Sequence, residues 1–290
     1  AWAENNIEFG PDAPFPGPFD RSRLPFLTEI LKALAPEDPC RIVTVRKSAQ
    51  IGGTIVGTIF AVGSVDLDPG LFLFVHPTED NGARWSRTKL TPFLRSTSSL
   101  SRLFPERSRD GANAVLYKER RDGRGAILVS GANSPASLSQ ITVKRQVQDD
   151  LAKWDTNAAG DPEKQADSRS RAHEFAKILQ ISTPMVLPGC RITRDFMAGS
   201  QEYFYVPCPH CEHMQILEWE NFKASIDPER PEDAHFICPA CGCEIREHHR
   251  PAMLARMEVR AHNPKAKRYH RSCHVWSAYA HGLQSFEQIA

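Results

Sequence analysis

The fold of this chain is decided by the stretch Arg41-Ile42-Val43-Thr44-Val45-Arg46-Lys47-Ser48-Ala49-Gln50-Ile51-Gly52-Gly53-Thr54. Residues 41–45 are mostly apolar and β-branched, which predicts a buried strand, and the small and apolar residues from Thr54 to Val65 predict a helix. A glycine turn between a strand and a helix presents backbone N–H groups and the positive helix end to an anion. The stretch therefore predicts a phosphate-binding loop, for which the alternative, on these residues alone, is a plain Gly-Gly turn.

The loop lacks a lysine at the usual place. A standard phosphate loop ends Gly-Lys-Ser/Thr, whereas this one ends Gly52-Gly53-Thr54. We expect Lys47, at the start of the turn, to reach the β- and γ-phosphates of ATP from the other side, and the Thr54 hydroxyl to bind Mg²⁺. The predicted phosphate-binding residues are Arg46, Lys47, Ser48, Ala49, Gln50, Ile51, Gly52, Gly53 and Thr54.

Strands and helices alternate along the chain on both sides of this loop. Such alternation is typical of a mainly parallel sheet with helices on both faces. The sequence therefore predicts an α/β, P-loop NTPase-like fold. Besides the strand and helix above, we expect strands at 71–75, 126–130, 143–148 and 177–182 and helices at 24–34, 81–94 and 163–175.

An acidic pair, Asp149 and Asp150, follows the predicted strand 143–148. We expect Asp149 to hold Mg²⁺ through water, and Asp150 to orient and deprotonate the water that attacks ATP. The alternative is an ordinary helix N-cap, since the strand before the pair is unusually polar. If Asp150 is not the base, Glu79 and Asp155 are the next candidates.

Two tight turns downstream carry a cysteine at each end: Cys208-Pro209-His210-Cys211 and Cys238-Pro239-Ala240-Cys241. Two such turns supply the four soft thiolates of a closed tetrahedral zinc site. We therefore expect a small zinc ribbon after the α/β part. The predicted Zn²⁺ ligands are Cys208, Cys211, Cys238 and Cys241.

Short strands predicted at 215–219 and 235–237 bring the two turns together, with a loop between them. The alternatives to zinc are free thiols or disulfides. Cys243, His210 and His213 lie close to the turns in sequence, and each is a possible replacement ligand.

The composition is that of a globular protein. The 290 residues are 41% hydrophobic and 24% charged, and no apolar run is long enough to span a membrane. The sequence does not open with a basic segment followed by an apolar one, so we expect no secretory signal. Eight cysteines, four of them in the two turns, favour a reducing compartment, the cytoplasm. The net charge is only +1, so any DNA contact must come from a local patch, such as the basic residues in 246–271.

Short segments of a further pattern run along nearly the whole chain. In series they resemble the large terminase subunit of lambda-type tailed bacteriophages, the ATPase of a DNA-packaging motor. Lambda-type loops carry their lysine at the position of Lys47, whereas Asp150 stands where the family usually has glutamate. The segments are Trp2-Ala3-Glu4, 47–54, Asp68-Pro69-Gly70, His76-Pro77-Thr78-Glu79, 131–136, Asp149-Asp150, Gly160-Asp161-Pro162, Ile181-Ser182-Thr183-Pro184 and 205–211.

The resemblance implies a motor subunit that hydrolyses ATP and translocates double-stranded DNA into a procapsid. It implies a homo-oligomeric ring at the portal protein, a small terminase subunit as a partner, no membrane, and the host cytoplasm as the location. Ser182 and Thr183, after a predicted strand, would couple loss of the γ-phosphate to DNA movement. The family context also implies an arginine finger from a neighbouring subunit, for which Arg46, Arg84 and Arg87 are candidates.

The resemblance implies adenine packing by Trp2 and residues 25–26, with core packing as the alternative. It divides the chain into an ATPase domain at 1–200, a zinc ribbon at 201–250 and a basic tail at 251–290. The family's C-terminal endonuclease has no support here, because no carboxylate cluster follows the ribbon. We therefore expect the tail to lead toward an absent nuclease domain.

Two functions of other kinds fit the same residues. One is a zinc-ribbon nucleic-acid-binding protein with an inactive or helicase-like ATPase core, which Gly53 and Asp150 suggest. The other is an assembly component that uses the ribbon to dock proteins. DNA-stimulated ATP hydrolysis would exclude the first, and salt-sensitive DNA binding would count against the second.

Overall fold

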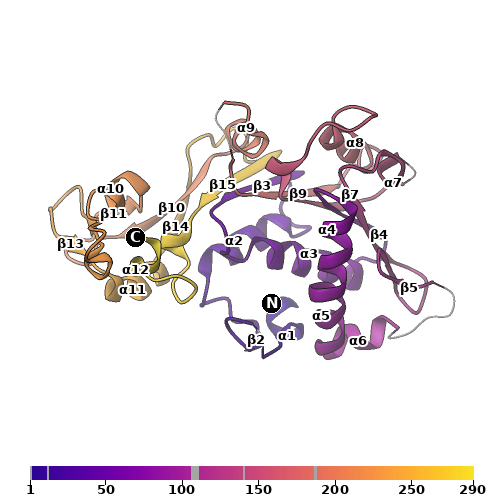
Figure 1. Cartoon of the computed structure of the whole chain (residues 1–290), viewed down its shortest axis with the longest axis horizontal. Coiled ribbons are helices and arrows are strands. Elements are labelled where there is room, and N and C mark those ends of the chain that lie inside the picture. Colours follow the sequence, from indigo (N-terminus) through magenta and orange to yellow (C-terminus); the bar gives the residue numbers. More distant parts are fainter. Residues whose placement is uncertain (1, 12, 106–110, 140, 186–187) are drawn as a thin grey trace.

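The computed structural model describes residues 2–11, 13–105, 111–139, 141–185 and 188–290. At its centre lies one mixed sheet with helices on both faces, and over these residues the sheet has eleven strands (Figure 1). The α/β fold predicted from the sequence is confirmed. The strand order is β11 (Met214–Ile216), β10 (Glu202–Pro207), β15 (His270–Val275), β3 (Ile42–Lys47), β9 (Lys177–Ser182), β8 (Arg145–Asp149), β4 (Leu71–His76), β7 (Ala126–Gly131), β6 (Tyr117–Glu119) and β5 (Asn113–Ala114), and β14 (Glu258–Ala261) also pairs with β10.

The seven neighbouring strands from β10 to β7 run parallel to one another. The antiparallel strands lie at the two ends: β5 and β6 at one, β11 and β14 at the other. Because parallel strands end at the same edge, the residues that follow β3, β9, β8 and β4 meet there. This edge brings the predicted phosphate loop and the acidic pair together.

Helices cover the two faces of the sheet (Figure 1). On one face, α3 (Gly53–Leu67) packs on β4, β7, β8 and β9, and α2 (Pro25–Leu34) packs on α3 and β3. α3 is apolar nearly all round because its outer side is covered as well, by α1 (Trp2–Asn6), α2 and α6 (Ser98–Leu103). The opposite face carries α7 (Pro135–Ser139), α8 (Pro162–Ser168) and α9 (Arg191–Ala198).

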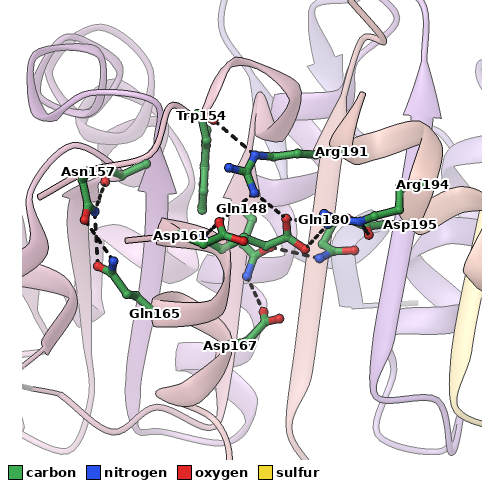
Figure 2. A network of polar contacts seen from close by, with 12 residues as sticks. Gln148, Trp154, Asn157, Asp161, Gln165, Asp167, Gln180, Arg191, Arg194 and Asp195 are labelled. Carbon is green, nitrogen blue, oxygen red and sulfur yellow. Dashed lines mark hydrogen bonds and ion pairs between the residues drawn. The ribbon is translucent and has the colours of Figure 1, made fainter. Parts of the chain in front are cut away.

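A row of buried, hydrogen-bonded polar side chains crosses the face of the sheet that carries α8. Thr44 Oγ1 donates to Gln180 Oε1 at 2.7 Å, and Gln180 Nε2 donates to Gln148 Oε1 at 3.1 Å. Gln148 Nε2 donates to Asp167 Oδ1 at 2.7 Å, as Figure 2 shows. Burial raises the pKa of Asp167 to about 6. Because each polar group has a partner, β8 is a buried strand in spite of its polar sequence.

Ion pairs tie α8 to α9 above this row (Figure 2). Arg191 Nη1 lies 2.7 Å from Asp161 Oδ1, and Arg194 Nη2 lies 2.6 Å from Glu163 Oε1. Arg191 Nε also donates to the carbonyl oxygen of Trp154 at 3.2 Å, and Trp154 Nε1 donates to the carbonyl oxygen of Asp149 at 2.9 Å. The two helices therefore hold the end of β8 in place.

The predicted helix 81–94 is wrong in its continuity. The structure has α4 (Glu79–Trp85), a π-helical segment η1 (Ser86–Leu90) and α5 (Thr91–Ser96). Pro92 has no N–H to bond back to the preceding turn, so the regular helical pattern does not run through it. The other strands and helices of the α/β part, apart from the helix at 163–175, agree with the structure to within a few residues.

Two further elements are shorter than predicted. The helix expected at 163–175 ends at Ser168, because the Arg41 guanidinium binds the carbonyl oxygens of Ser170 and His173 in the turns that follow. The strand expected at 215–219 ends at Ile216, and Trp219 opens the short helix α10 (Trp219–Lys223).

The C-terminal segment lies inside the fold. The sequence predicts a basic tail at 251–290, but β15 from this segment pairs with β3 along its whole length. Arg271 is buried rather than exposed: Nη2 lies 2.7 Å from Glu202 Oε2 and Nη1 lies 2.8 Å from Asp38 Oδ2. The boundaries at residues 200 and 250 stay a prediction.

Beyond β10 the chain forms a lobe at one end of the sheet, coloured orange in Figure 1. The C-terminal helix packs on it, because Phe286 lies 5.2 Å from Phe222 and 5.3 Å from Phe236, measured between ring centroids. The lobe and the remaining described elements comprise η3 (Pro231–Asp233), β12 (Phe236–Ile237), β13 (Glu244–Ile245), η4 (Glu247–His249), α11 (Arg250–Ala255), η5 (Ser277–Tyr279), α12 (Phe286–Ile289), β1 (Glu8–Phe9), β2 (Gly17–Pro18) and η2 (Leu151–Lys153).

Candidate nucleotide site and cysteine cluster

The predicted phosphate loop lies between β3 and α3. Gln50 and Gly52 have left-handed backbone conformations, with φ of 58° and 87°, and Gly52 directly precedes α3. A Cβ atom at Gly53 would lie 2.7 Å from Lys47 Cδ and 2.9 Å from Ile181 Cγ2. The Lys47 side chain therefore lies across the first turn of α3 and requires glycine at position 53.

Lys47 is almost buried, with 8% of its surface exposed. Its Nζ donates to the carbonyl oxygen of Ser48 at 3.2 Å. Burial lowers the pKa of the Lys47 ammonium, and the carboxylates of Asp149 and Asp150 oppose this shift. The helix N-terminus and the ammonium together place positive potential at the predicted phosphate position.

Asp149 lies at the end of β8 with two polar side chains beside its carboxylate. Thr54 Oγ1 donates to Asp149 Oδ2 at 3.2 Å, and His76 Nδ1 lies 3.6 Å from the same oxygen. Burial first, and the neighbouring Asp150 second, raise the pKa of Asp149 to about 6. The structure thus brings together Thr54 and Asp149, the two residues predicted to bind Mg²⁺.

Asp150 has an uncommon backbone conformation, with φ of 52°. Its Oδ2 lies 2.7 Å from Lys153 Nζ, and its carbonyl oxygen accepts a hydrogen bond from the backbone N of Lys153 at 2.8 Å. Ser182 Oγ accepts a hydrogen bond from the backbone N of Ala152 at 3.0 Å. Ser182, predicted to couple hydrolysis to movement, therefore contacts the turn that carries Asp150, while the next residue, Thr183, is half-buried.

The four cysteines predicted to bind zinc meet at the tips of the two turns. All four sulfur atoms lie within 4.8 Å of one another. Cys208 Sγ is 3.8 Å from Cys241 Sγ, and Cys211 Sγ is 3.7 Å from Cys238 Sγ. Thiolates about 2.3 Å from a tetrahedral Zn²⁺ lie about 3.8 Å apart, so this spacing fits the ion. The cysteines are free thiols, so the disulfide alternative is wrong.

The three possible replacement ligands lie outside this cluster. Cys243 and His213 contribute backbone carbonyl oxygens, which accept from Cys238 N at 3.0 Å and Cys208 N at 2.8 Å. His210 Nε2 lies 3.1 Å from the carbonyl oxygen of Glu244. These bonds close the turns and orient the cysteines.

Comparison with known sequences identifies the family. Residues 13–258 match the family model described as "Phage terminase large subunit gpA, ATPase domain". The chain belongs to this family. The large terminase subunit of Escherichia phage lambda is 27% identical over 238 residues, which cover 77% of this chain and 36% of that protein. That of Enterobacteria phage P21 is 25% identical over 234 residues, with 77% and 36% covered. This terminase chain therefore spans about a third of the length of these relatives, from the 36% covered.

Solved structures similar to this terminase chain include the ATPase domain of the Thermus phage P74-26 large terminase. Its TM-score is 0.48 at 12% identity, with 85% of this chain and 79% of that chain covered. The large terminase of another thermophilic bacteriophage has a TM-score of 0.41 at 22% identity, with 58% and 39% covered. In the described parts of this terminase chain, every helix is too short or too polar to cross a membrane.

Arg46 lies apart from the other predicted phosphate-binding residues of the terminase loop. Successive side chains of a strand point to opposite faces, and Lys47 faces α3. The Arg46 guanidinium lies 4.1 Å above the ring of Phe196 in α9, and its Nε donates to His274 Nδ1 at 3.2 Å. Within its own chain, Arg46 therefore connects β3 to α9 and β15.

The other arginine-finger candidates, Arg84 and Arg87, are exposed on α4 and η1. These elements follow β4, whose last residue contacts Asp149. Trp2 lies far from the loop: its Nε1 donates to Asp66 Oδ2 at 2.8 Å, at the opposite end of α3. Phe26 is buried, and it lines a small cavity together with Lys47.

Sequence reasoning about this terminase missed His76. It is buried, its ring stacks on Phe74 with centroids 4.9 Å apart, and burial lowers its pKa to about 4. A neutral imidazole therefore faces the Asp149 carboxylate. The available signal was its place after an apolar strand, 71–75, since side chains at the ends of parallel strands meet at one edge.

Proposed function

We propose that this chain is the ATP-hydrolysing motor part of a phage terminase, which translocates double-stranded DNA into a procapsid. The observation that carries the proposal is the meeting of Lys47, Thr54 and Asp149 at one edge of the sheet. A lysine, a hydroxyl for Mg²⁺ and an acid at a strand end are the parts that P-loop ATPases use there. The family's description as an ATPase domain supports the same activity.

ATP and Mg²⁺ fit the residues present. Mg²⁺, when bound, neutralises charge on the β- and γ-phosphate oxygens. Thr54 Oγ1 and Asp149 Oδ2 would hold it, since the two oxygens already lie 3.2 Å apart. The Lys47 ammonium would leave the Ser48 carbonyl for the phosphates. Residues 48–54 would surround the phosphates with backbone N–H groups.

The hydrolytic water would be oriented and deprotonated by Asp150, which would exchange its ion pair with Lys153 for the water. The alternative bases are exposed: Glu79 opens α4, and Asp155 follows the turn after β8. Ser182 and Thr183 would couple phosphate loss to DNA movement, because Ser182 is bonded to the turn after Asp150. Loss of the γ-phosphate would release this turn and move the end of β9.

The arginine finger would come from a neighbouring subunit of a ring. Arg84 and Arg87 are the better candidates, because both are exposed close to the catalytic edge. Arg46 is held by Phe196 and His274 of its own chain. The same assembly would include double-stranded DNA, the portal protein and a small terminase subunit, in the host cytoplasm.

The cysteine cluster would bind one Zn²⁺. Its four sulfur atoms have the spacing of a closed structural site, with Cys208 and Cys238 buried and Cys211 and Cys241 exposed. A metal there supplies folding energy to the turns rather than chemistry to the ATP site.

Hydrolysis of ATP by the purified chain, with and without duplex DNA, tests the motor. Lys47→Ala should lower kcat by about 100-fold or more, the usual loss when one preorganised charge is removed. Asp150→Asn should retain ATP binding without turnover. Lys164→Ala removes an exposed lysine on α8 and is the matched control.

The result also separates the motor from its alternative, a nucleic-acid-binding protein with an inactive core. DNA-stimulated hydrolysis that depends on Lys47 excludes the inactive core. Hydrolysis that survives Lys47→Ala contradicts the displaced-lysine site, and absence of hydrolysis in the unmodified chain contradicts the motor.

A further inference from the structure

The basic residues between 246 and 271 divide into two groups in the structure. Lys265, Lys267 and Arg268 are exposed, and in the described parts of the chain none of them has an acidic partner within ion-pair distance. Every other arginine of this stretch is paired. The pairs are Arg246 with Glu244 and Asp233, Arg250 with Glu247, Arg256 with Glu212, Arg260 with Glu258, and Arg271 with Glu202 and Asp38.

The three cations share one loop, residues 263–269, which we call the basic loop. Its backbone is fixed by turn hydrogen bonds, Lys267 N to Pro264 O at 3.2 Å and Tyr269 N to Ala266 O at 2.9 Å. The Arg268 guanidinium lies 5.6 Å from the ring centroid of Tyr269, whose side chain is exposed. A cluster of cations and an aromatic ring on a fixed backbone binds a polyanion with little loss of conformational freedom.

Two contacts anchor the basic loop to the sheet. Asn263 N donates to the carbonyl oxygen of Ser200 at 2.9 Å, and Arg41 N donates to that of Tyr269 at 2.9 Å. The Arg41 guanidinium binds the carbonyl oxygens of the segment 169–175. This neighbouring segment adds the exposed Arg171 and one acid, Glu174.

The basic loop lies at the edge of the sheet opposite to the nucleotide site. It precedes His270, where β15 begins, whereas Val275 at the end of β15 accepts a hydrogen bond from Ser48 N in the phosphate loop at 3.2 Å. Six residues of strand, at about 3.3 Å each, separate the two by about 20 Å. The basic loop is therefore a second anion-binding surface and does not belong to the ATP site.

We propose that the basic loop binds the phosphate backbone of double-stranded DNA. The proposal rests on the proposed motor function, which requires the chain to hold DNA while ATP is hydrolysed elsewhere on the sheet. Duplex DNA carries about one charge per 1.7 Å of axis, so three cations within four residues can contact neighbouring phosphates at once. Phosphate contacts carry no sequence information, which suits a protein that moves along any DNA.

Binding of the chain to a fluorescent duplex of mixed sequence, measured by anisotropy across a series of salt concentrations, tests the proposal. The variant Lys265→Gln, Lys267→Gln, Arg268→Gln should bind more weakly. Each lost phosphate contact reduces the slope of log K against log salt by about 0.9, so the slope should become shallower by about 2 to 3. Basal ATP hydrolysis should stay unchanged.

Two control variants accompany this one. Arg102→Gln, Lys164→Gln, Lys223→Gln removes three exposed cations from other elements and changes the net charge equally. It should keep the original salt slope. Lys265→Arg, Lys267→Arg, Arg268→Lys keeps the charge of the loop, and it should keep the slope as well.

Several outcomes would overturn the proposal. An unchanged slope in the glutamine variant, or equal loss in the Arg102, Lys164 and Lys223 control, would show that the loop is not a specific DNA contact. A glutamine variant with normal DNA binding but defective assembly would point to an acidic protein instead. If the unmodified chain hydrolyses ATP through Lys47 but does not bind duplex DNA, the loop proposal fails and the ATPase proposal stands.

Discussion

Lys47 and Gly53 are a matched pair in this phosphate loop. A standard loop builds its lysine on the first turn of the helix, whereas here the ammonium arrives from the end of β3. Only glycine at position 53 leaves room for it, because a Cβ would lie 2.7 Å from Lys47 Cδ. The sequence shows that a lysine is missing, but not why, since the contact depends on the left-handed turn at Gln50 and Gly52.

Replacing Gly53 with alanine should therefore impair the ATPase even though no charged group is lost. The new methyl would push the Lys47 side chain and Ile181 away, and a misplacement of about 1 Å can cost about 100-fold in rate. We expect a fall in kcat of about 10- to 100-fold with the fold intact, measured by steady-state ATP hydrolysis and circular dichroism.

Gly70→Ala is the matched control, because a Cβ at Gly70 has open space within 4 Å. It should leave kcat unchanged. Gly53→Lys would restore the standard loop pattern, but its Cβ meets the same collision, so we expect no rescue. Normal turnover by Gly53→Ala would mean that Lys47 does not act along the path seen here.

The predictability of the elements depended on where their polar groups are satisfied. Strands 71–75, 126–130 and 177–182 are apolar or β-branched, and the sequence alone located them. β8 and β15 are equally buried but polar, because their side chains bond to neighbours that are distant in sequence. Gln148 is bonded to Asp167, and Thr44 lies 2.8 Å from His270 Nε2. Such partners are visible only once the sheet has formed, which is why β15 was missed.

The polar composition of β15 predicts acid sensitivity. Burial lowers the pKa of His270 and His274 to about 4, and for His274 the nearby Arg46 charge adds to the effect. The unfolded chain binds protons at these histidines below about pH 6.5, whereas the folded chain does so only near pH 4. The unfolded state therefore holds more protons in this window, and stability falls as pH drops from 6.5 to 4. Each histidine accounts for up to about 3 kcal/mol.

Comparison of the original chain with His270→Gln isolates this contribution, since buried Asp149 and Asp167 titrate in the same window with the opposite sign. Urea unfolding at pH 7 and pH 4.5 should show a smaller loss of unfolding free energy for the variant. Exposed His262→Gln is the control and should follow the original chain. Equal pH dependence in His270→Gln would contradict the prediction.

At the scale of the whole molecule, the cysteine lobe is built together with the C-terminus. Tyr279 OH donates to the carbonyl oxygen of Phe204 at 2.7 Å and accepts from Leu217 N at 2.9 Å. Trp276 Nε1 donates to the carbonyl oxygen of Leu217 at 2.6 Å, and Phe286 packs between the lobe's phenylalanines. The sequence located the metal ligands, because their spacing is local. It did not show that residues 276–289 complete the lobe's core, because those contacts span long separations.

This shared core determines what loss of the metal should do. Cys208→Ser should remove Zn²⁺, whose binding supplies on the order of 10 kcal/mol to small structural sites. Because Phe286 packs on Phe222 and Phe236, we expect faster hydrogen exchange in residues 208–245 and also in α12, at the far end of the sequence. β3, β8 and β9 should stay protected, since their sheet is covered by helices on both faces. Cys243→Ser should keep the zinc, because Cys243 supplies only a backbone carbonyl. Purified chain without zinc would contradict the site, and an α12 that stays protected in Cys208→Ser would contradict the shared core.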